Sequence, residues 1–254
     1  MATSFKRLPR HISPIHYELC LKPDLTSFSF TGSVQIQVKY ETEAKDGEKN
    51  DLVKLNVNEL DVKSVSAKGI PDIKEFKVFK EKELLEVTLS KGLDLGQEFS
   101  LAIEFSGTLN DQMRGFYRTK QKDGSTAAAC HFEATGARKA FPCWDEPVFR
   151  STFKVKAPSK IKRQNKKNRF IFPQISLTVP KDLTTLSNMP EASREPDAEN
   201  SALDRITFGV TPKMPSYLTC WTLGKYDHIE GKSDKLNIPV RIFTPTGRSE
   251  VRED

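Results

Sequence analysis

A strict alternation of polar and apolar residues over Ser33–Tyr40 constrains the fold of this chain more than any other feature. The segment reads Ser-Val-Gln-Ile-Gln-Val-Lys-Tyr, so every second side chain is apolar. Successive side chains of a β-strand point to opposite faces, whereas a helix requires a repeat of 3.6 residues. The segment therefore predicts a strand with one buried face and one solvated face.

Similar short apolar runs recur along the 254 residues, and turn residues separate them. No stretch has the periodicity of a long amphipathic helix, and many short strands at this spacing are typical of antiparallel sheets. We therefore predict an all-β fold, a large, mostly antiparallel β saddle or sandwich. We expect an extended lead-in at 5–16 and polar loops at 42–51 and 187–201. The other strand candidates are 17–22, 53–57, 62–67, 76–79, 84–89, 99–105, 115–118, 149–155, 175–179, 205–210, 217–223 and 238–243.

The formal net charge of +6 comes from one basic run. Seven Lys and Arg residues lie within 156–169, which contains no acidic residue, and the rest of the chain carries −1. We interpret this run as a solvated, flexible insertion. The alternative is a nucleic-acid or nuclear-import patch. Only Phe170 and Phe172 accompany the run, so it lacks an interleaved stacking platform, and we expect no nucleic-acid partner.

The sequence shows no signal for export or for a membrane. The N-terminus lacks the apolar core of a signal peptide, and no apolar run approaches the ~20 residues that span a bilayer. We therefore expect a soluble, cytoplasmic protein. Its four cysteines are widely spaced and form no C-x-x-C pair, which favours buried free thiols over disulfides or a zinc ribbon.

Common catalytic motifs are absent from the sequence. There is no H-E-x-x-H, no G-x-S-x-G, no P-loop and no G-x-G-x-x-G. We therefore predict no catalytic residue and no metal ligand in this chain.

Residues 131–147 mix charged and apolar side chains too densely for a plain strand or surface helix. A charge held among apolar groups needs a partner, and such places often mark function. One interpretation is a functional site. The other is a structural corner pinned by an arginine–carboxylate pair, and the residues alone favour neither. The charged residues are Glu133, Arg138, Asp145 and Glu146, and the apolar ones include Phe132, Phe141, Pro142 and Trp144.

The same stretch resembles a segment of zinc aminopeptidases of the puromycin-sensitive and aminopeptidase N type. That segment has the form F-E-x-x-x-A-R-x-x-F-P-C-x-D-E-P, and residues 132–147 match it throughout. Further matches in the same order include Pro14–Tyr17, Phe30–Gly32 and Gly115–Arg118, so the resemblance covers essentially the whole chain. It implies a single N-terminal β saddle domain over 1–254, with an insertion at about 156–174.

In this family the saddle packs on a separate helical domain that carries G-A-M-E-N and the zinc motif H-E-x-x-H. The sequence stops before either motif. The resemblance therefore implies that the catalytic domain is absent, that zinc belongs to the intact enzyme only, and that this chain is inactive alone. The implied partners are peptide N-termini and the missing catalytic domain.

The resemblance also assigns residue roles. Glu133 is expected to bind the free α-amino group of a peptide and to precede a cis peptide bond to Ala134. His131, where the family often has glutamine, is a possible second substrate contact. Arg138, Asp145 and Glu146 are expected to form the structural support, and Cys143 to be a packed thiol. The competing function is a non-catalytic β-sandwich binding module that acts through its sheet surface or the basic insertion.

Overall fold

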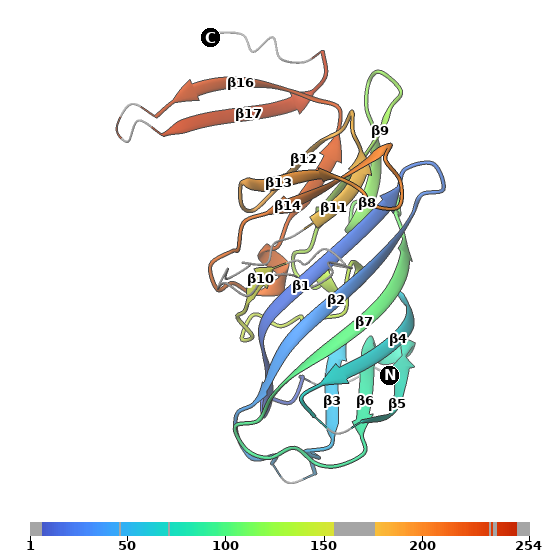
Figure 1. Cartoon of the computed structure of the whole chain (residues 1–254), viewed down its shortest axis with the longest axis vertical. Coiled ribbons are helices and arrows are strands. Elements are labelled where there is room, and N and C mark those ends of the chain that lie inside the picture. The colour runs from blue at the N-terminus through green and yellow to red at the C-terminus, as the bar shows by residue number, and fades with distance from the viewer. Residues whose placement is uncertain are drawn as a thin grey trace, which may run out of the picture.

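Strands dominate this chain, as predicted. The computed structural model describes residues 7–45, 47–70, 72–154, 176–233, 235 and 238–247. Within these ranges the strands form four sheets, and the helices are three short 3-10 turns (Figure 1). All strand pairs are antiparallel except β1 with β10 and β1 with β11. The all-β, mostly antiparallel fold is therefore confirmed.

The elements are β1 (Ile12–Asp24), β2 (Ser29–Tyr40), β3 (Leu52–Asn56), β4 (Asp61–Lys68), β5 (Ile73–Phe79), η1 (Lys80–Lys82), β6 (Leu84–Leu89), β7 (Glu98–Thr108), β8 (Gly115–Lys120), β9 (Thr126–His131), η2 (Ala137–Lys139), β10 (Thr152–Lys154), β11 (Ser176–Pro180), β12 (Thr184–Ser187), β13 (Glu191–Pro196), β14 (Leu203–Phe208), η3 (Ser216–Leu218), β15 (Trp221–Gly224), β16 (Tyr226–Lys232) and β17 (Pro239–Pro245).

The large sheet has the strand order β13-β14-β11-β1-β2-β7-β4, and β10 also pairs with β1. Its centre is the long antiparallel trio β1, β2 and β7, which curves along the length of the molecule (Figure 1). The alternation of Ser33–Tyr40 continues through β2, whose apolar side chains are buried. This buried face fixes the register, because a slip of one residue would expose every one of them.

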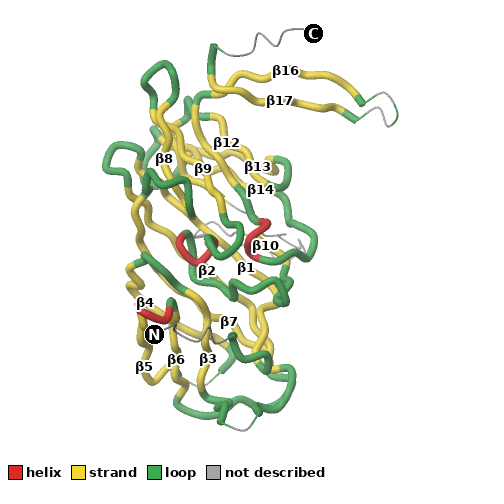
Figure 2. Tube along the Cα trace, turned by 180° about the vertical axis from the view of Figure 1, so that it is seen from behind, coloured by secondary structure: helices red, strands yellow, loops and turns green. Residues whose placement is uncertain are grey.

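Three smaller sheets complete the fold. The sheet β12-β15-β9-β8 lies at one end of the large sheet, and the sheet β3-β6-β5 lies at the other (Figures 1 and 2). The hairpin of β16 and β17 projects from the body beyond the first of these sheets (Figure 2).

Several predicted elements were wrong, for identifiable reasons. The segment 187–201 is not simply a loop, because it contains β13, a polar edge strand that is mostly exposed on both faces. The run 217–223 begins as η3 and becomes a strand only at Trp221. There the side chain of Asn188 donates to the C=O of Leu218 and accepts from the N–H of Cys220, so these backbone groups bond a side chain in place of a neighbouring strand.

Other strands lacked a usable signal. β9 was missed because it is rich in alanine, which is a weak strand former. The structure shows why small residues are used there: β9 and β15 approach so closely that a Cβ atom at Gly224 would lie 2.8 Å from Ala127. β12 and β16 were also missed, and the predicted lead-in already forms strand from Ile12. The basic run 156–169 and the whole proposed insertion lie outside the described residues.

An aromatic cluster forms the core where the segment 131–147 meets the sheets. The ring of Phe141 is fully buried and lies 6.1–6.2 Å, centroid to centroid, from those of Tyr17, Phe132, Phe153 and Trp221. Aromatic pairs at such separations stabilise a core beyond their buried area.

We predict that Phe141→Ala lowers the free energy of unfolding by about 3–5 kcal/mol, because the surrounding rings cannot all collapse into the cavity. Urea denaturation measures this change. Met113→Ala is the control: Met113 is 65% exposed, and its replacement should change stability by less than about 0.5 kcal/mol. Equal effects of the two substitutions would contradict this packing.

Candidate functional site

The segment 137–146 connects three sheets through hydrogen bonds of its backbone and of the Asp145 side chain. The N–H and C=O of Cys143 bond the C=O and N–H of Asn56, the last residue of β3 in the three-stranded sheet. The N–H of Trp144 donates to the hydroxyl of Tyr17 in β1 of the large sheet, at 3.0 Å. The hydroxyl of Ser216, close before β15 of the four-stranded sheet, donates to Asp145 at 2.7 Å. The segment is thus the place where these sheets meet.

Arg138 supplies the positive charge of this junction although it is only 4% exposed. Its Nε donates to Oδ2 of Asp145 at 3.0 Å, and one terminal nitrogen donates to the C=O of Asp145 at 3.1 Å. The other terminal nitrogen donates to Oε2 of Glu83 at 2.8 Å. Burial opposes the charge, but Asp145 and Glu83 together raise the pKa of Arg138. The guanidinium therefore stays charged inside the protein.

Both carboxylate oxygens of Asp145, its backbone C=O and its backbone N–H all have hydrogen-bond partners. Besides Arg138 and Ser216, its backbone N–H donates to Oδ1 of Asn56 at 3.1 Å. The arginine–carboxylate pair that one interpretation of the sequence required is present, in a bidentate arrangement with a side chain and a main chain oxygen.

Glu83 was not found by sequence reasoning. It lies in the turn after β5, with a backbone φ of 51°, and its Oε1 accepts a hydrogen bond from the side chain of Asn58 at 2.7 Å. Its other carboxylate oxygen accepts the bond from Arg138. In the sequence it stands in a run of alternating lysine and glutamate, 55 residues before Arg138, and no signal separates it from its solvated neighbours.

Glu146 faces the N-terminal lead-in. Its Oε1 accepts the backbone N–H of Leu8 at 2.7 Å, and its Oε2 lies 3.6 Å from the guanidinium of Arg7. Glu146 itself is buried, whereas Arg7 is 65% exposed. This carboxylate thus fixes the start of the described chain against the segment 137–146.

Glu133 differs from these residues because its side chain is exposed and makes no hydrogen bond or ion pair with any other described residue. The preceding Phe132 is buried, 5.1 Å from the ring of Trp221. The peptide bond from Glu133 to Ala134 is cis, as the resemblance predicted. A side chain at Gly136 would come within 2.6 Å of the C=O of His131, so only glycine allows the tight turn that follows.

His131 ends β9 opposite Gly115 and is exposed. Residues 131 and 133 therefore both present their side chains to solvent, on either side of the buried Phe132. The residues predicted as substrate contacts are separate from the buried residues Arg138, Asp145 and Glu146.

All four cysteines are free, as predicted, but their burial was predicted only in part. Cys143 is fully buried, and burial together with the nearby Asp145 raises the pKa of its thiol well above the ordinary value. Such a thiol stays protonated and is not a nucleophile. Cys20 and Cys130 are half-buried, and Cys220 is exposed because its neighbour Trp221 takes the inward position.

The described residues contain no group of three His, Cys, Asp or Glu side chains that could hold a metal ion. Their histidines have other surroundings: His11 bonds Glu48, His16 bonds Thr152, and His228 stacks on Phe243. The described chain therefore does not fit a zinc site. No helix in its described part is long and apolar enough to cross a membrane.

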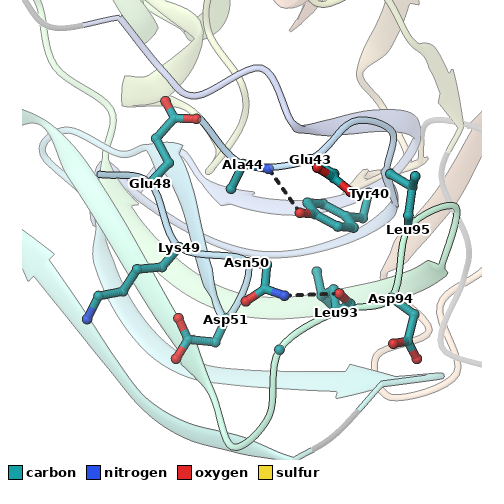
Figure 3. Close-up of a pocket in the computed structure, with 11 residues that line it drawn as sticks. Tyr40, Glu43, Ala44, Glu48, Lys49, Asn50, Asp51, Leu93, Asp94 and Leu95 are labelled. Atoms are coloured by element: carbon teal, nitrogen blue, oxygen red, sulfur yellow. Dashed lines mark hydrogen bonds between the residues drawn. The ribbon is translucent and has the colours of Figure 1, made fainter. Parts of the chain in front are cut away.

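A hollow of about 670 Å³ lies between the loop after β2 and the loop before β7 (Figure 3). Carboxylates of Glu43, Glu48, Asp51 and Asp94 surround it. The N–H of Ala44 donates to the hydroxyl of Tyr40, and the side chain of Asn50 donates to the C=O of Leu93, so these bonds hold the loops themselves. No residue of 131–147 lines this hollow.

Comparison with models of protein families identifies the family of this chain. The family model described as the peptidase M1 N-terminal domain matches residues 13–167 and 165–218. The chain belongs to this family. Both matched parts include or adjoin the basic run, and the first contains the whole segment 131–147.

Curated relatives are aminopeptidases. The chain is 35% identical over 248 residues to aminopeptidase M1-C of Oryza sativa subsp. japonica, which covers 96% of this chain and 25% of that protein. It is 33% identical over 256 residues to the puromycin-sensitive aminopeptidase of Caenorhabditis elegans, covering 98% and 24%. Against the alanine/arginine aminopeptidase of Saccharomyces cerevisiae (strain ATCC 204508 / S288c) it is 32% identical over 251 residues, covering 94% and 25%. The chain thus spans about a quarter of the length of these relatives.

We predict that Arg138→Met lowers the free energy of unfolding by about 3–5 kcal/mol, because it leaves the buried carboxylate of Asp145 without its counter-charge. Chemical denaturation monitored by tryptophan fluorescence measures the change. Arg150→Met is the matched control, since Arg150 is exposed and has no ion pair within the described residues. A loss for Arg138→Met no larger than the control's would contradict the role of the pair.

The raised pKa of the Cys143 thiol predicts loss of stability at alkaline pH. The unfolded chain releases this proton above about pH 8.5, whereas the folded chain retains it to higher pH. The thiol's contribution is therefore complete below pH 8.5 and declines as the pH rises toward the folded pKa. Between pH 9 and 10.5 the free energy of unfolding should fall less steeply with pH in Cys143→Ala than in the unsubstituted protein, by up to about 1.4 kcal/mol per pH unit. Parallel slopes for the two proteins would show that the prediction is wrong.

Proposed function

We propose that this chain is the peptide-recognition domain of a zinc metalloaminopeptidase, with Glu133 binding the free α-ammonium group of a peptide substrate. One observation carries the proposal: within the described chain Glu133 is an exposed, unpaired carboxylate on a segment otherwise held between three sheets. The membership in a family whose relatives are named aminopeptidases supports it.

The physical reason for a carboxylate is the selectivity that an aminopeptidase requires. An enzyme that removes N-terminal residues must distinguish a free ammonium from an internal amide, and only the ammonium adds a positive charge to its hydrogen bond with a carboxylate. Removing one member of such a buried pair typically costs ~2–5 kcal/mol. Within the complex Glu133 would face the peptide's first residue.

Neighbouring residues support this role in two ways, by positioning the segment and by a second contact with the substrate. Arg138, Asp145 and Glu146 act as positioning residues, because they hold the segment that carries Glu133 against the sheets. His131 would contact the substrate beside Glu133; in support, both side chains are exposed on either side of the buried Phe132.

Hydrolysis is not assigned to this chain. The described residues lack a zinc site, so we propose that zinc and the catalytic residues belong to a further domain, and that the present chain, a single domain with a basic insertion, is inactive alone. We further propose a cytoplasmic location.

Peptide binding tests the role of Glu133. In calorimetry with the purified chain, we expect an unblocked short peptide to bind and its N-acetylated form to bind at least tenfold more weakly. Glu133→Gln should abolish this preference. Glu195→Gln is the matched control, because Glu195 is also exposed and unpaired within the described residues. Equal binding of blocked and unblocked peptides would overturn the proposal.

A chimera extends the test to turnover. The chain would replace the matching quarter of the Caenorhabditis elegans relative, and Glu133→Ala should then reduce kcat/KM by about 30-fold to several thousand-fold, which corresponds to ~2–5 kcal/mol. An active chimera that is insensitive to Glu133→Ala would contradict it.

The alternative function, nucleic-acid binding through the basic insertion, has less support. The relatives compared above are aminopeptidases, and the insertion lies outside the described residues. Tight, salt-dependent binding of nucleic acid by the purified chain would favour it instead.

A further inference from the structure

Strands β10 and β11 lie on the same edge of β1 and point in the same direction. The other edge of β1 is paired with β2 along its whole length. On the remaining edge, residues 16–18 pair in parallel with 152–154, and residues 20–21 pair in parallel with 176–177. Figure 1 shows β10 and β11 at successive levels beside β1. The two strands therefore occupy consecutive stretches of one line.

The registers of these two pairings are in phase. Glu18 of β1 lies opposite Lys154, the last residue of β10. Two residues further along β1, Cys20 lies opposite Ser176, the first residue of β11. A single position, opposite Leu19, thus separates the two strands, and one residue suffices to span the gap of about 6.6 Å. The sequence has 21 residues there, which is 20 more than a continuous strand needs.

The side chains of β10 and β11 alternate as those of one strand would. Phe153 is buried, with its ring stacked 4.8 Å from that of Tyr17, and Leu177 and Val179 are fully buried. With 20 residues left out, the order becomes Thr-Phe-Lys-Val-Ser-Leu-Thr-Val, in which every second residue is apolar. Because strand side chains have a period of two, only an even number of extra residues keeps these apolar side chains on one face.

A second neighbour also runs along both strands. β14 pairs antiparallel with β11, and its Thr207 lies opposite Ser176. The chain then continues to Thr211, whose hydroxyl accepts the N–H of Phe153 at 3.1 Å and whose N–H donates to the C=O of Phe153 at 3.3 Å. The neighbours on both sides are therefore continuous where β10 and β11 are interrupted.

We propose that β10 and β11 are two parts of one strand, and that residues 156–175 are an insertion which neither the fold nor the recognition of a peptide N-terminus requires. The seven basic residues of 156–169 then belong wholly to the insertion, whereas Glu133 and its supporting residues belong to the domain that the insertion interrupts. The part of this proposal that concerns peptide recognition rests on the role proposed for Glu133, and the part that concerns the fold does not.

Two deletions of equal length test the strand. Deletion of 156–175 and deletion of 155–174 each remove 20 residues and leave one apolar residue, Val155 or Ile175, for the position opposite Leu19. Both proteins should fold and should unfold at a urea concentration no lower than the full chain does, since a shorter connection costs less entropy to close.

Deletion of 155–175 is the matched control, because it differs from the other two by a single residue. It leaves no residue for the position opposite Leu19, so one of the two strands must shift its register and turn its apolar side chains to the wrong face. Its urea midpoint should fall clearly below those of the other deletions. Failure of both 20-residue deletions to fold, or equal midpoints for all three, would overturn the proposal.

Peptide binding separates the insertion from the recognition site. In calorimetry, the full chain and both 20-residue deletions should show the same preference for an unblocked peptide over its N-acetylated form. If the full chain has this preference and a folded deletion lacks it, the insertion takes part in recognition and the proposal is wrong. If the full chain itself has no preference, the role of Glu133 is wrong instead, and the urea midpoints still decide whether the strand is interrupted by an insertion.

Discussion

The ion pair of Arg138 with Asp145 is the interaction on which the arrangement of the sheets depends. A guanidinium that is 4% exposed is stable only if carboxylates and hydrogen-bond acceptors replace the water it has lost. Asp145 provides two of those acceptors, and Glu83 provides a third from the connection between β5 and β6. Because Asp145 also accepts a bond from Ser216, the charge and its partners link separate parts of the chain.

The same geometry explains how a small exposed feature can be held in place. The backbone of Cys143 is paired with β3, and that of Trp144 with the hydroxyl of Tyr17 in β1. The buried rings around Phe141 fill the space between these contacts. Glu133 lies just outside this junction and has no bond to it through its side chain within the described residues. A rigid support and an unpaired carboxylate are what recognition of an ammonium group requires.

The alternation of Ser33–Tyr40 was sufficient to predict β2, because a strand with one buried and one solvated face alternates apolar and polar residues. The pairing of Arg138 with a carboxylate was also accessible, since Asp145 lies only seven residues away. Glu83 was not, because a partner from a distant turn has no local signature. β13 and β9 were missed for a related reason: one is polar because it is an edge strand, and the other is alanine-rich because β15 packs closely against it.

Native-state hydrogen exchange of the junction is the most direct test of the central claim that this segment is locked into three sheets. The amides of Cys143, Trp144 and Asp145 donate to Asn56 and Tyr17 and should exchange only through global unfolding, with protection equal to that of the β1–β2 ladder. Exchange of these three amides through a local opening of clearly lower free energy than the β1–β2 ladder would contradict the account.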